Sequence, residues 1–362
     1  GVYRTSGQYL PIDEILSQQS PLSTSSTVAN SKETPLTLAN GFPVISGADA
    51  NTFAVDPDLR LGTSQSWQVM AQRDLWGFLT ATASYLGTRG DHLLQEFLPN
   101  TYAPGAATTC ASCPVGFIYL TSGGRSVRNA AQWQLRWRLH RGFAASVQYT
   151  LASARDNAAA FTNVSLGGSA VAQNWLDLDA EMGRSSFDQR HQMVATFQYT
   201  TGVGLGGGGL MDGTRGRILG GWTVAGSLNT GSGMPFSPIY LVPVGGSGVT
   251  GALRPSLTGT SATPINGYYL NPDAYTAPAA GQYGNAPRNA LTGPAPFSFD
   301  MSVARTFQWT PRLTLDWRLD STNVLNIQTY TGVNAVFGGT QFGLPSQVNT
   351  PRRIVSTLRL RF

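Results

Sequence analysis

Apolar and polar residues alternate one by one in several long stretches of the chain. In one stretch Trp133, Leu135, Trp137 and Leu139 are interleaved with glutamine and arginine, and after three residues the alternation resumes from Phe143 to Leu151. Successive side chains of a β-strand point to opposite faces, so this period of two indicates strands rather than helices. The short interruption predicts a β-hairpin with a tight turn at residues 140–142.

The same alternation returns along the chain, strongly near the end and more weakly before it. Further strands are expected at residues 67–71, 79–85, 193–199, 222–228, 297–309, 313–319 and 354–362, and an opening strand from Val2 to Ile15. Together these make about ten strands. The best runs last about 10–14 residues, whereas soluble strands average about 5–6 and tilted membrane-spanning strands need about 9–11. The lengths favour strands that cross a membrane.

The connections alternate between short and long. Tight turns are expected near residues 75–77, 140–142 and 309–311, and a glycine-rich turn at 201–217. Long connections rich in proline, glycine and asparagine are expected at residues 21–62, 89–124, 156–184, 233–296 and 326–351. Outer-membrane barrels have short periplasmic turns and long extracellular loops. The fold class predicted is therefore all-β: an antiparallel transmembrane β-barrel segment with every long loop on one side.

Composition agrees with a barrel and excludes other classes. Only 12% of the 362 residues are charged, about half the share usual in soluble proteins. The chain has no apolar run of about 18 residues, so a transmembrane helix is excluded. The net charge of +5 comes almost entirely from scattered arginines, with Lys32 the only lysine. Without a basic tract, nucleic acid is not expected as a partner.

The two cysteines form the single motif Cys110-Ala111-Ser112-Cys113. A redox site would require a βαβ context, which is absent, and a zinc site would require a second pair of ligands. We expect a small Cys110–Cys113 disulfide in an exported loop. No metal and no cofactor are expected.

Polar residues on the strands are the candidates for a barrel lumen. We expect Gln134, Arg136, Arg138, Asp316 and Arg318 to face the lumen, where they would contact cargo, each other or a plug. Four tryptophans share the opposite parity with leucines, which favours lipid-facing or interfacial positions over a sugar-stacking platform. They are Trp133, Trp137, Trp309 and Trp317.

Two further sets of polar residues are candidates for metal-binding or catalytic sites. Asp177, Asp179 and Glu181 could hold Ca²⁺ or act as paired carboxylates, but a solvated acidic loop is the simpler interpretation. His191 could suggest acid–base chemistry, but no nucleophile accompanies it, and we expect it to form a hydrogen bond at the start of a strand. The chain is therefore not expected to be an enzyme.

A series of short motifs runs in order along nearly the whole chain. They are DPDLR (56–60), QSW (65–67), YLGTRG (85–90), CPVGFIYLTS (113–122), FDQRH (187–191), GW (221–222), SGMPF (232–236), YLNP (269–272), GNAPRN (284–289) and NVLN (323–326). In this order they resemble TonB-dependent outer-membrane transporters, in particular the Oar-like branch that carries a carboxypeptidase-regulatory-like domain. Leu358, Leu360 and the terminal Phe362 resemble the C-terminal signal for outer-membrane assembly.

The resemblance implies that residues 1–362 are the C-terminal part of one outer-membrane β-barrel domain. About ten strands of a roughly 22-stranded barrel would be present, with the plug and N-terminal domains absent. The function implied is TonB-dependent uptake of an oligosaccharide, peptide or chelate across the bacterial outer membrane. The implied partners are outer-membrane lipid, the barrel-assembly machinery, TonB through the plug region, and an extracellular cargo. The alternative from another class is a secreted all-β adhesin or carbohydrate-binding module, with strands packed in two sheets.

Overall fold

The structure is a computed structural model, and it describes most of the strand-forming chain. The described residues are 1–4, 13, 16–17, 22, 35, 37–38, 53–97, 118–157, 172–174, 177–202, 214, 218–242, 253–308, 310 and 313–362.

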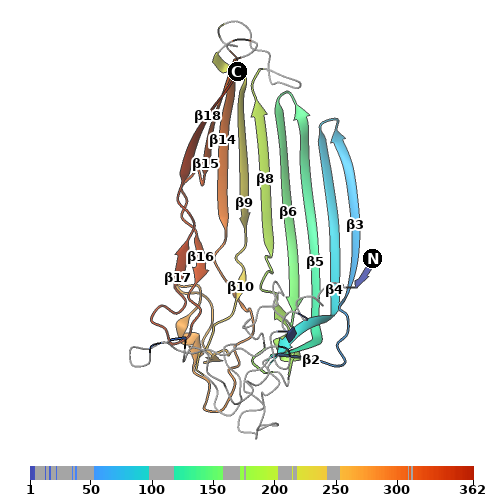
Figure 1. The fold of residues 1–362 in the computed structure, drawn as a ribbon, viewed down its shortest axis with the longest axis vertical. Helices are drawn as coiled ribbons and strands as arrows, with labels where there is room; N and C mark the ends of the chain where they lie inside the picture. The colour runs from blue at the N-terminus through green and yellow to red at the C-terminus, as the bar shows by residue number, and fades with distance from the viewer. Residues whose placement is uncertain are drawn as a thin grey trace.

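One large sheet dominates the described residues (Figure 1). Ten strands form its continuous path, each antiparallel to its neighbours. In spatial order they are β1 (Val2–Arg4), β3 (Thr63–Trp76), β4 (Leu79–Phe97), β5 (Ile118–His140), β6 (Phe143–Asp156), β8 (His191–Thr200), β9 (Trp222–Gly231), β14 (Phe297–Gln308), β15 (Thr314–Thr322) and β18 (Arg353–Arg361). Every strand predicted from the alternation is present in the predicted order. The predicted all-β antiparallel fold is confirmed.

The connections alternate in length as predicted. β3–β4, β5–β6, β8–β9 and β14–β15 are joined at one end of the sheet, at the top of Figure 1, beside the C-terminus. The β5–β6 turn consists of Arg141 and Gly142, whose φ angles of 49° and 80° are those of a two-residue hairpin turn that follows the twist of the strands. The long connections lie at the other end.

Two predicted boundaries are wrong. The connection expected at 89–124 begins later and ends earlier than predicted, because β4 continues to Phe97 and β5 already begins at Ile118. Their pairing continues, with bulges, from Gly90↔Ser126 to Phe97↔Tyr119. The alternation fades there because polar residues occupy both faces, although the backbone ladder persists. The opening strand also does not run to Ile15, since Asp13 is helical, and Pro11 supplies no N–H for a ladder.

The long connections contain their own small elements. Antiparallel pairs are formed by β10 (Pro235–Phe236) with β13 (Leu291–Thr292), β11 (Ser256–Leu257) with β12 (Tyr275–Thr276), and β16 (Tyr330–Val333) with β17 (Pro345–Val348). β2 (Phe53–Val55) pairs in parallel with β5, and β7 (Gly183–Arg184) pairs with β6. Two 3₁₀ turns, η1 (Asp179–Glu181) and η2 (Pro272–Ala274), complete them. These elements form a folded layer at the long-connection end.

Apolar packing is concentrated in this layer and not against the sheet. A buried cluster joins two of the long connections, the one between β9 and β14 and the one between β15 and β18, and consists of Leu270, Ala274, Tyr275, Ala286, Leu291 and Phe342. The large apolar side chains of the sheet are instead exposed, for example Trp133 at 46% and Leu135 at 49%. Among the described residues, no helix has the length and apolar character needed to cross a bilayer.

Candidate functional site

The strand register separates an apolar face from a polar face across the whole sheet. Trp133 lies between Ala83 and Tyr149, and Leu135 lies between Ala81 and Val147. At the far edge Leu358 lies opposite Trp317, and the one charged neighbour of Trp317 there, Arg305, lies over the rings of Trp222 and Phe307. Side chains of paired residues share one face, so the apolar residues of neighbouring strands form one continuous surface.

This apolar surface has the height of a bilayer core. Along β5 it extends from Leu139 to Ala131, which is about 27 Å at about 3.4 Å per residue. Beyond this point the same face carries Asn129 on β5 and Arg89 on β4. An outward apolar band of an outer-membrane barrel is about 25 Å tall. The exposed apolar face therefore fits contact with lipid.

Aromatic rings collect at the short-turn end of this surface. Phe78 lies 4.5 Å from Trp137 and 4.7 Å from His140 between ring centroids, and Trp137 also meets Phe143 edge-on. Three strands further on, Trp222 and Trp317 pack edge-on at 5.7 Å. Aromatic girdles of this kind mark the membrane interface of barrels. The ring contacts agree with the interfacial positions expected for Trp137 and Trp317; Trp309 lies outside the described residues.

The polar face carries the five residues expected to line a lumen. Most of them bond to neighbours on the same face: Arg138 to Asp74 at 3.2 Å, Arg318 to Asp320 at 2.8 Å, and Thr306 Oγ1 to Asp316 Oδ1 at 2.7 Å. Asp316 also pairs with Arg361. Gln134 reaches Ser146 Oγ at 3.5 Å. The bonds of Gln134 and Asp316 join adjacent strands, the Arg138–Asp74 pair spans β4, and the Arg318–Asp320 pair lies within β15. The position of these residues facing a lumen stays a prediction.

A hollow of about 570 Å³ lies near Arg136 and Arg138 at the short-turn half of the sheet. Its lining includes Ser146, Thr196 and Gln198, which belong to the polar face. Arg136 thus stands beside hydroxyl and amide groups in a hollow whose lining also includes apolar residues such as Trp137 and Phe197. Such a surface suits an acidic or hydrogen-bonding partner.

The folded layer is held together by a buried ion-pair network. Arg254 donates two hydrogen bonds of 2.8 Å to the carboxylate of Glu181, and its Nε donates to the Ala286 carbonyl. Arg288 pairs with the carboxylate of Asp156 and donates to the backbone carbonyls of Asp156 and Glu181. The network joins the end of β6, η1 and the connection between β9 and β14. Fully bonded buried charges of this kind fix the arrangement of the segments that carry them.

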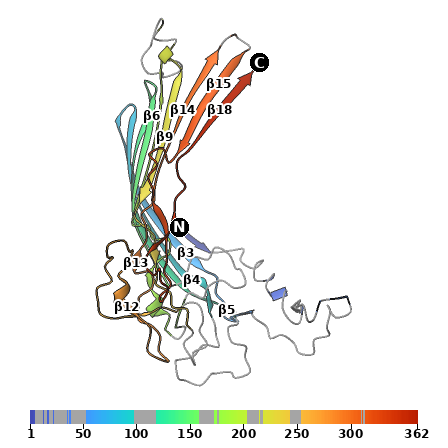
Figure 2. The same cartoon turned by 90° about the vertical axis from the view of Figure 1, so that its left-hand side faces the viewer.

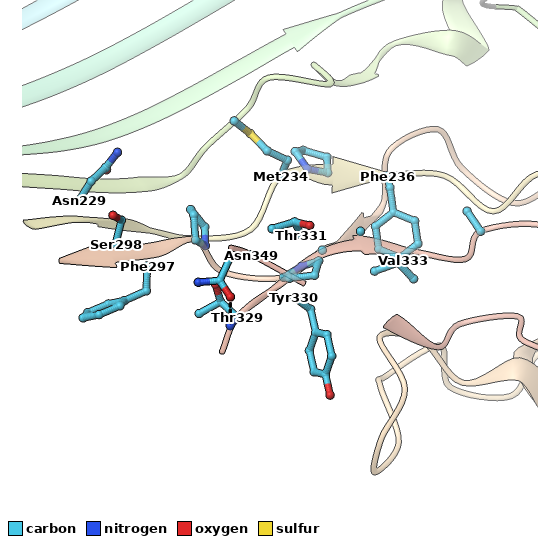
Figure 3. A pocket seen from close by; sticks show the side chains of 16 residues that line it. Asn229, Met234, Phe236, Phe297, Ser298, Thr329, Tyr330, Thr331, Val333 and Asn349 are labelled. Carbon is cyan, nitrogen blue, oxygen red and sulfur yellow. Dashed lines mark hydrogen bonds between the residues drawn. The ribbon is translucent and has the colours of Figure 1, made fainter. Parts of the chain in front are cut away.

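A second cavity, of about 470 Å³, lies where the sheet meets the folded layer (Figure 3). Asn229, from the end of β9, and Phe297 and Ser298, from the start of β14, lie at one end of it. Phe236 of β10 and Val333 of β16 lie at the other. Its volume is within the range of ligand pockets, about 300–1,000 Å³.

The acidic residues near η1 differ in their exposure to solvent. Asp177 and Asp179 are exposed, as expected for a solvated loop. Glu181 is 1% exposed and bound to Arg254, so the solvated interpretation is wrong for this residue. No sequence signal identified Arg254 and Arg288 as its neighbours, because the contacts join segments far apart in the chain. Within the described residues, no group of three or more potential metal ligands is found.

The expected role of His191 is confirmed. It is the first residue of β8, its backbone N–H donates to Ser232 Oγ at 3.0 Å, and its Nδ1 lies 2.7 Å from the Tyr149 hydroxyl.

Leu358 and Leu360 are exposed on β18, and Phe362 is exposed at the end of the chain. Their role as an assembly signal stays a prediction. Cys110 and Cys113 lie outside the described residues, so their disulfide stays a prediction.

Comparisons with known proteins point to one architecture. The profile of a family described as "Outer membrane beta barrel domain" matches residues 1–355. No curated protein matches the sequence.

Several solved structures are similar. The outer membrane transporter YddB from Escherichia coli is 12% identical with a TM-score of 0.47, over 83% of this chain and 33% of that one. The ferric-catecholate import receptor Fiu from E. coli K12 is 12% identical with a TM-score of 0.45, over 100% of this chain and 32% of that one. The ferric preacinetobactin receptor BauA from Acinetobacter baumannii is 12% identical with a TM-score of 0.41, over 83% and 30%. This chain thus spans about a third of the length of these proteins.

Proposed function

The chain belongs to the outer membrane beta barrel domain family, and on this basis we propose that it is the C-terminal part of a TonB-dependent receptor that imports a nutrient. The family places it in the bacterial outer membrane. The observation that carries the proposal is the two-faced sheet: an apolar band of bilayer height on one side, a polar face on the other, and a folded layer at one end only. A barrel with these faces can bind cargo at its mouth and pass it along a polar interior.

Two features of the sheet support a larger barrel. β1 and β18 lie at opposite edges of the path of strands and do not pair with each other among the described residues. Seen from the side, the sheet bends along its length without closing (Figure 2). We therefore assign these ten strands to a barrel of roughly 22 strands, a size that leaves a lumen filled by a plug. TonB would act through that plug, in the N-terminal part of the protein.

The chemistry of such a receptor is binding and release, so no catalytic residue is assigned. The cargo belongs to one of three classes: oligosaccharides, peptides or chelates. Leu358, Leu360 and Phe362 would engage the barrel-assembly machinery. The alternative, a secreted sandwich of two packed sheets, is contradicted by the family match and by the single large sheet.

The test is uptake by cells that lack the gene encoding this chain. Deletion strains would be supplied with labelled oligosaccharides, peptides or ferric chelates, with and without an uncoupler that dissipates the proton gradient. We expect the deletion to abolish energy-dependent accumulation of one class, and the full-length gene to restore it. Unchanged accumulation of all three classes, with the protein present in wild-type outer membranes, would contradict the transport function.

A further inference from the structure

The 470 Å³ cavity lies where the sheet meets the folded layer, and it forms because two segments of the chain separate there. The segment after β10 and the segment after β16 run in parallel and are joined at Ile239, whose N–H donates to the Ala335 carbonyl and whose carbonyl accepts from the N–H of Phe337, both at 2.8 Å. Before that point the two segments diverge. The cavity occupies the opening between Met234–Phe236 and Thr329–Val333.

The lining of the cavity is apolar and carries no charge. None of its 16 lining residues is an aspartate, glutamate, lysine, arginine or histidine. Met234, Phe236, Phe297 and Val333 contribute apolar side chains, and three prolines contribute rings without N–H donors. An ionised ligand would lose part of its hydration here and find no opposite charge in the lining, which disfavours its binding. The lining therefore selects an uncharged, largely apolar group.

A few polar groups occupy defined places in the wall. Asn229 and Ser298 lie opposite each other on the polar face of the sheet. The side chain of Asn349 is already bonded, because Oδ1 accepts from the Thr329 N–H at 2.9 Å and Nδ2 donates to the Ile327 carbonyl at 3.0 Å. Thr331 is exposed on β16. A ligand with amide groups can bond to Asn229 and Thr331 while its side chain lies against the apolar wall.

We infer that this cavity binds an uncharged apolar or aromatic side chain of a peptide cargo. The inference rests on the proposed receptor function and narrows its cargo from three classes to one. An oligosaccharide presents hydroxyls on every ring, far more than the few polar groups of this wall can satisfy. An anionic chelate would require the cationic partners that the lining lacks. A neutral peptide segment matches both the apolar wall and the sparse hydrogen-bonding groups.

Photo-crosslinking of the full-length protein in lipid nanodiscs tests the inference. The probe is N-acetyl-glycyl-photoleucine N-methylamide, a neutral peptide whose side chain carries a diazirine. Mass spectrometry is expected to find crosslinks within residues 229–236 and 329–335. Excess N-acetyl-phenylalanine N-methylamide should compete, whereas maltotriose and N-acetyl-glutamate N-methylamide should not. Crosslinks confined to other segments, or equal competition by maltotriose, would overturn the inference.

Two substitutions at Thr331 test with the same probe whether the cavity itself is the binding site. Thr331→Trp should fill the cavity and reduce crosslinking by about tenfold or more. One extra methylene group in an apolar pocket already lowers the preference for a ligand by about that factor. Val348→Trp, at an exposed position opposite Tyr330 in the same hairpin but outside the lining, is the matched control and should crosslink normally. Thr331→Lys should make the glutamate peptide a competitor. If neither variant changes the crosslinking pattern, the cavity is not the site, whereas the transport function is judged by the uptake assay alone.

Discussion

Glu181 and Arg254 form a buried ion pair with two parallel hydrogen bonds, Nη1 to Oε2 and Nη2 to Oε1, each 2.8 Å long. The two residues are 73 positions apart and belong to different long connections. Together with the bonds of Gln173 to Gly284 and of Arg288 to Glu181, the pair joins the connection after β6 to the connection after β9.

Removal of the arginine should unfold this layer locally. Arg254→Met leaves the Glu181 carboxylate buried without a cationic partner, with only the Gln173 N–H among the described residues donating to it at 3.4 Å, and the loss of such a partner costs about 3–5 kcal/mol. We expect faster hydrogen–deuterium exchange in residues 253–289 and 177–188, with β4 and β5 unchanged. The control is Arg318→Met, which removes an exposed pair with Asp320 and should cost less than about 1 kcal/mol. Equal protection of the layer in both variants would show that the ion pair does not hold it.

Adjacent positions on β5 should respond oppositely to arginine. Leu135 is on the apolar face, and Leu135→Arg should destabilise the full-length barrel by about 2–4 kcal/mol near the bilayer midplane. Gln134 is on the polar face beside Ser146, and Gln134→Arg should cost less than about 1 kcal/mol. Urea titration in liposomes measures both. Similar losses at the two positions would contradict the assignment of faces.

The two ends of the sheet should differ in accessibility from outside the cell. Asn266 is exposed in the connection between β9 and β14, and Gly77 is exposed in the β3–β4 turn, where an added Cβ meets no atom within 4 Å. In a protein with Cys110 and Cys113 replaced by serine, Asn266→Cys should react with an impermeant maleimide on intact cells. Gly77→Cys should react only after the outer membrane is disrupted. The reverse pattern would invert the proposed topology.

The folded layer should be sensitive to alkali through one tyrosine. Burial raises the pKa of Tyr275, which packs edge-on against Phe342, above the ordinary value of about 10. The folded state thus disfavours the phenolate, so this contribution to stability is complete below pH 10 and is lost as the pH rises through the raised pKa. A spectrophotometric titration should show late-ionising tyrosine that Tyr275→Phe reduces, while Tyr269, whose pKa is also raised by burial, still ionises late. Identical curves for the two proteins would indicate that Tyr275 is accessible.

The sheet could be predicted from the sequence because lipid favours an apolar side chain at every second position of a membrane-spanning strand. The alternation from Trp133 to Leu139 identified the β5–β6 hairpin and its face, and similar runs gave the number and order of the strands. From Arg89 to Phe97 polar residues occur on both faces of the strand, so the alternation is lost. This part of the strand is therefore predicted as a connection, which is wrong.

The candidate site could not be predicted in the same way. Glu181, Arg254 and Arg288 meet through contacts between distant segments, and no local pattern distinguishes them from solvated charges. The 470 Å³ cavity depends on where the segments after β10 and β16 separate, and that point is set by the tertiary pairing at Ile239. His191 was predictable because its role is local to the start of its own strand.

The pairing of β4 and β5 continues for about 30 Å past the apolar band, counted along β5 from Arg128 back to Tyr119 at about 3.3 Å per residue. On the proposed topology these paired strands extend beyond the membrane into the folded layer, where β2 pairs with β5 and Gln95 donates to the Asn157 carbonyl at 3.0 Å. The sheet is then part of the surface that phages, antibodies and toxins would meet first on the cell. Substitutions selected by such attackers are expected in the described parts of this layer and not on the apolar band.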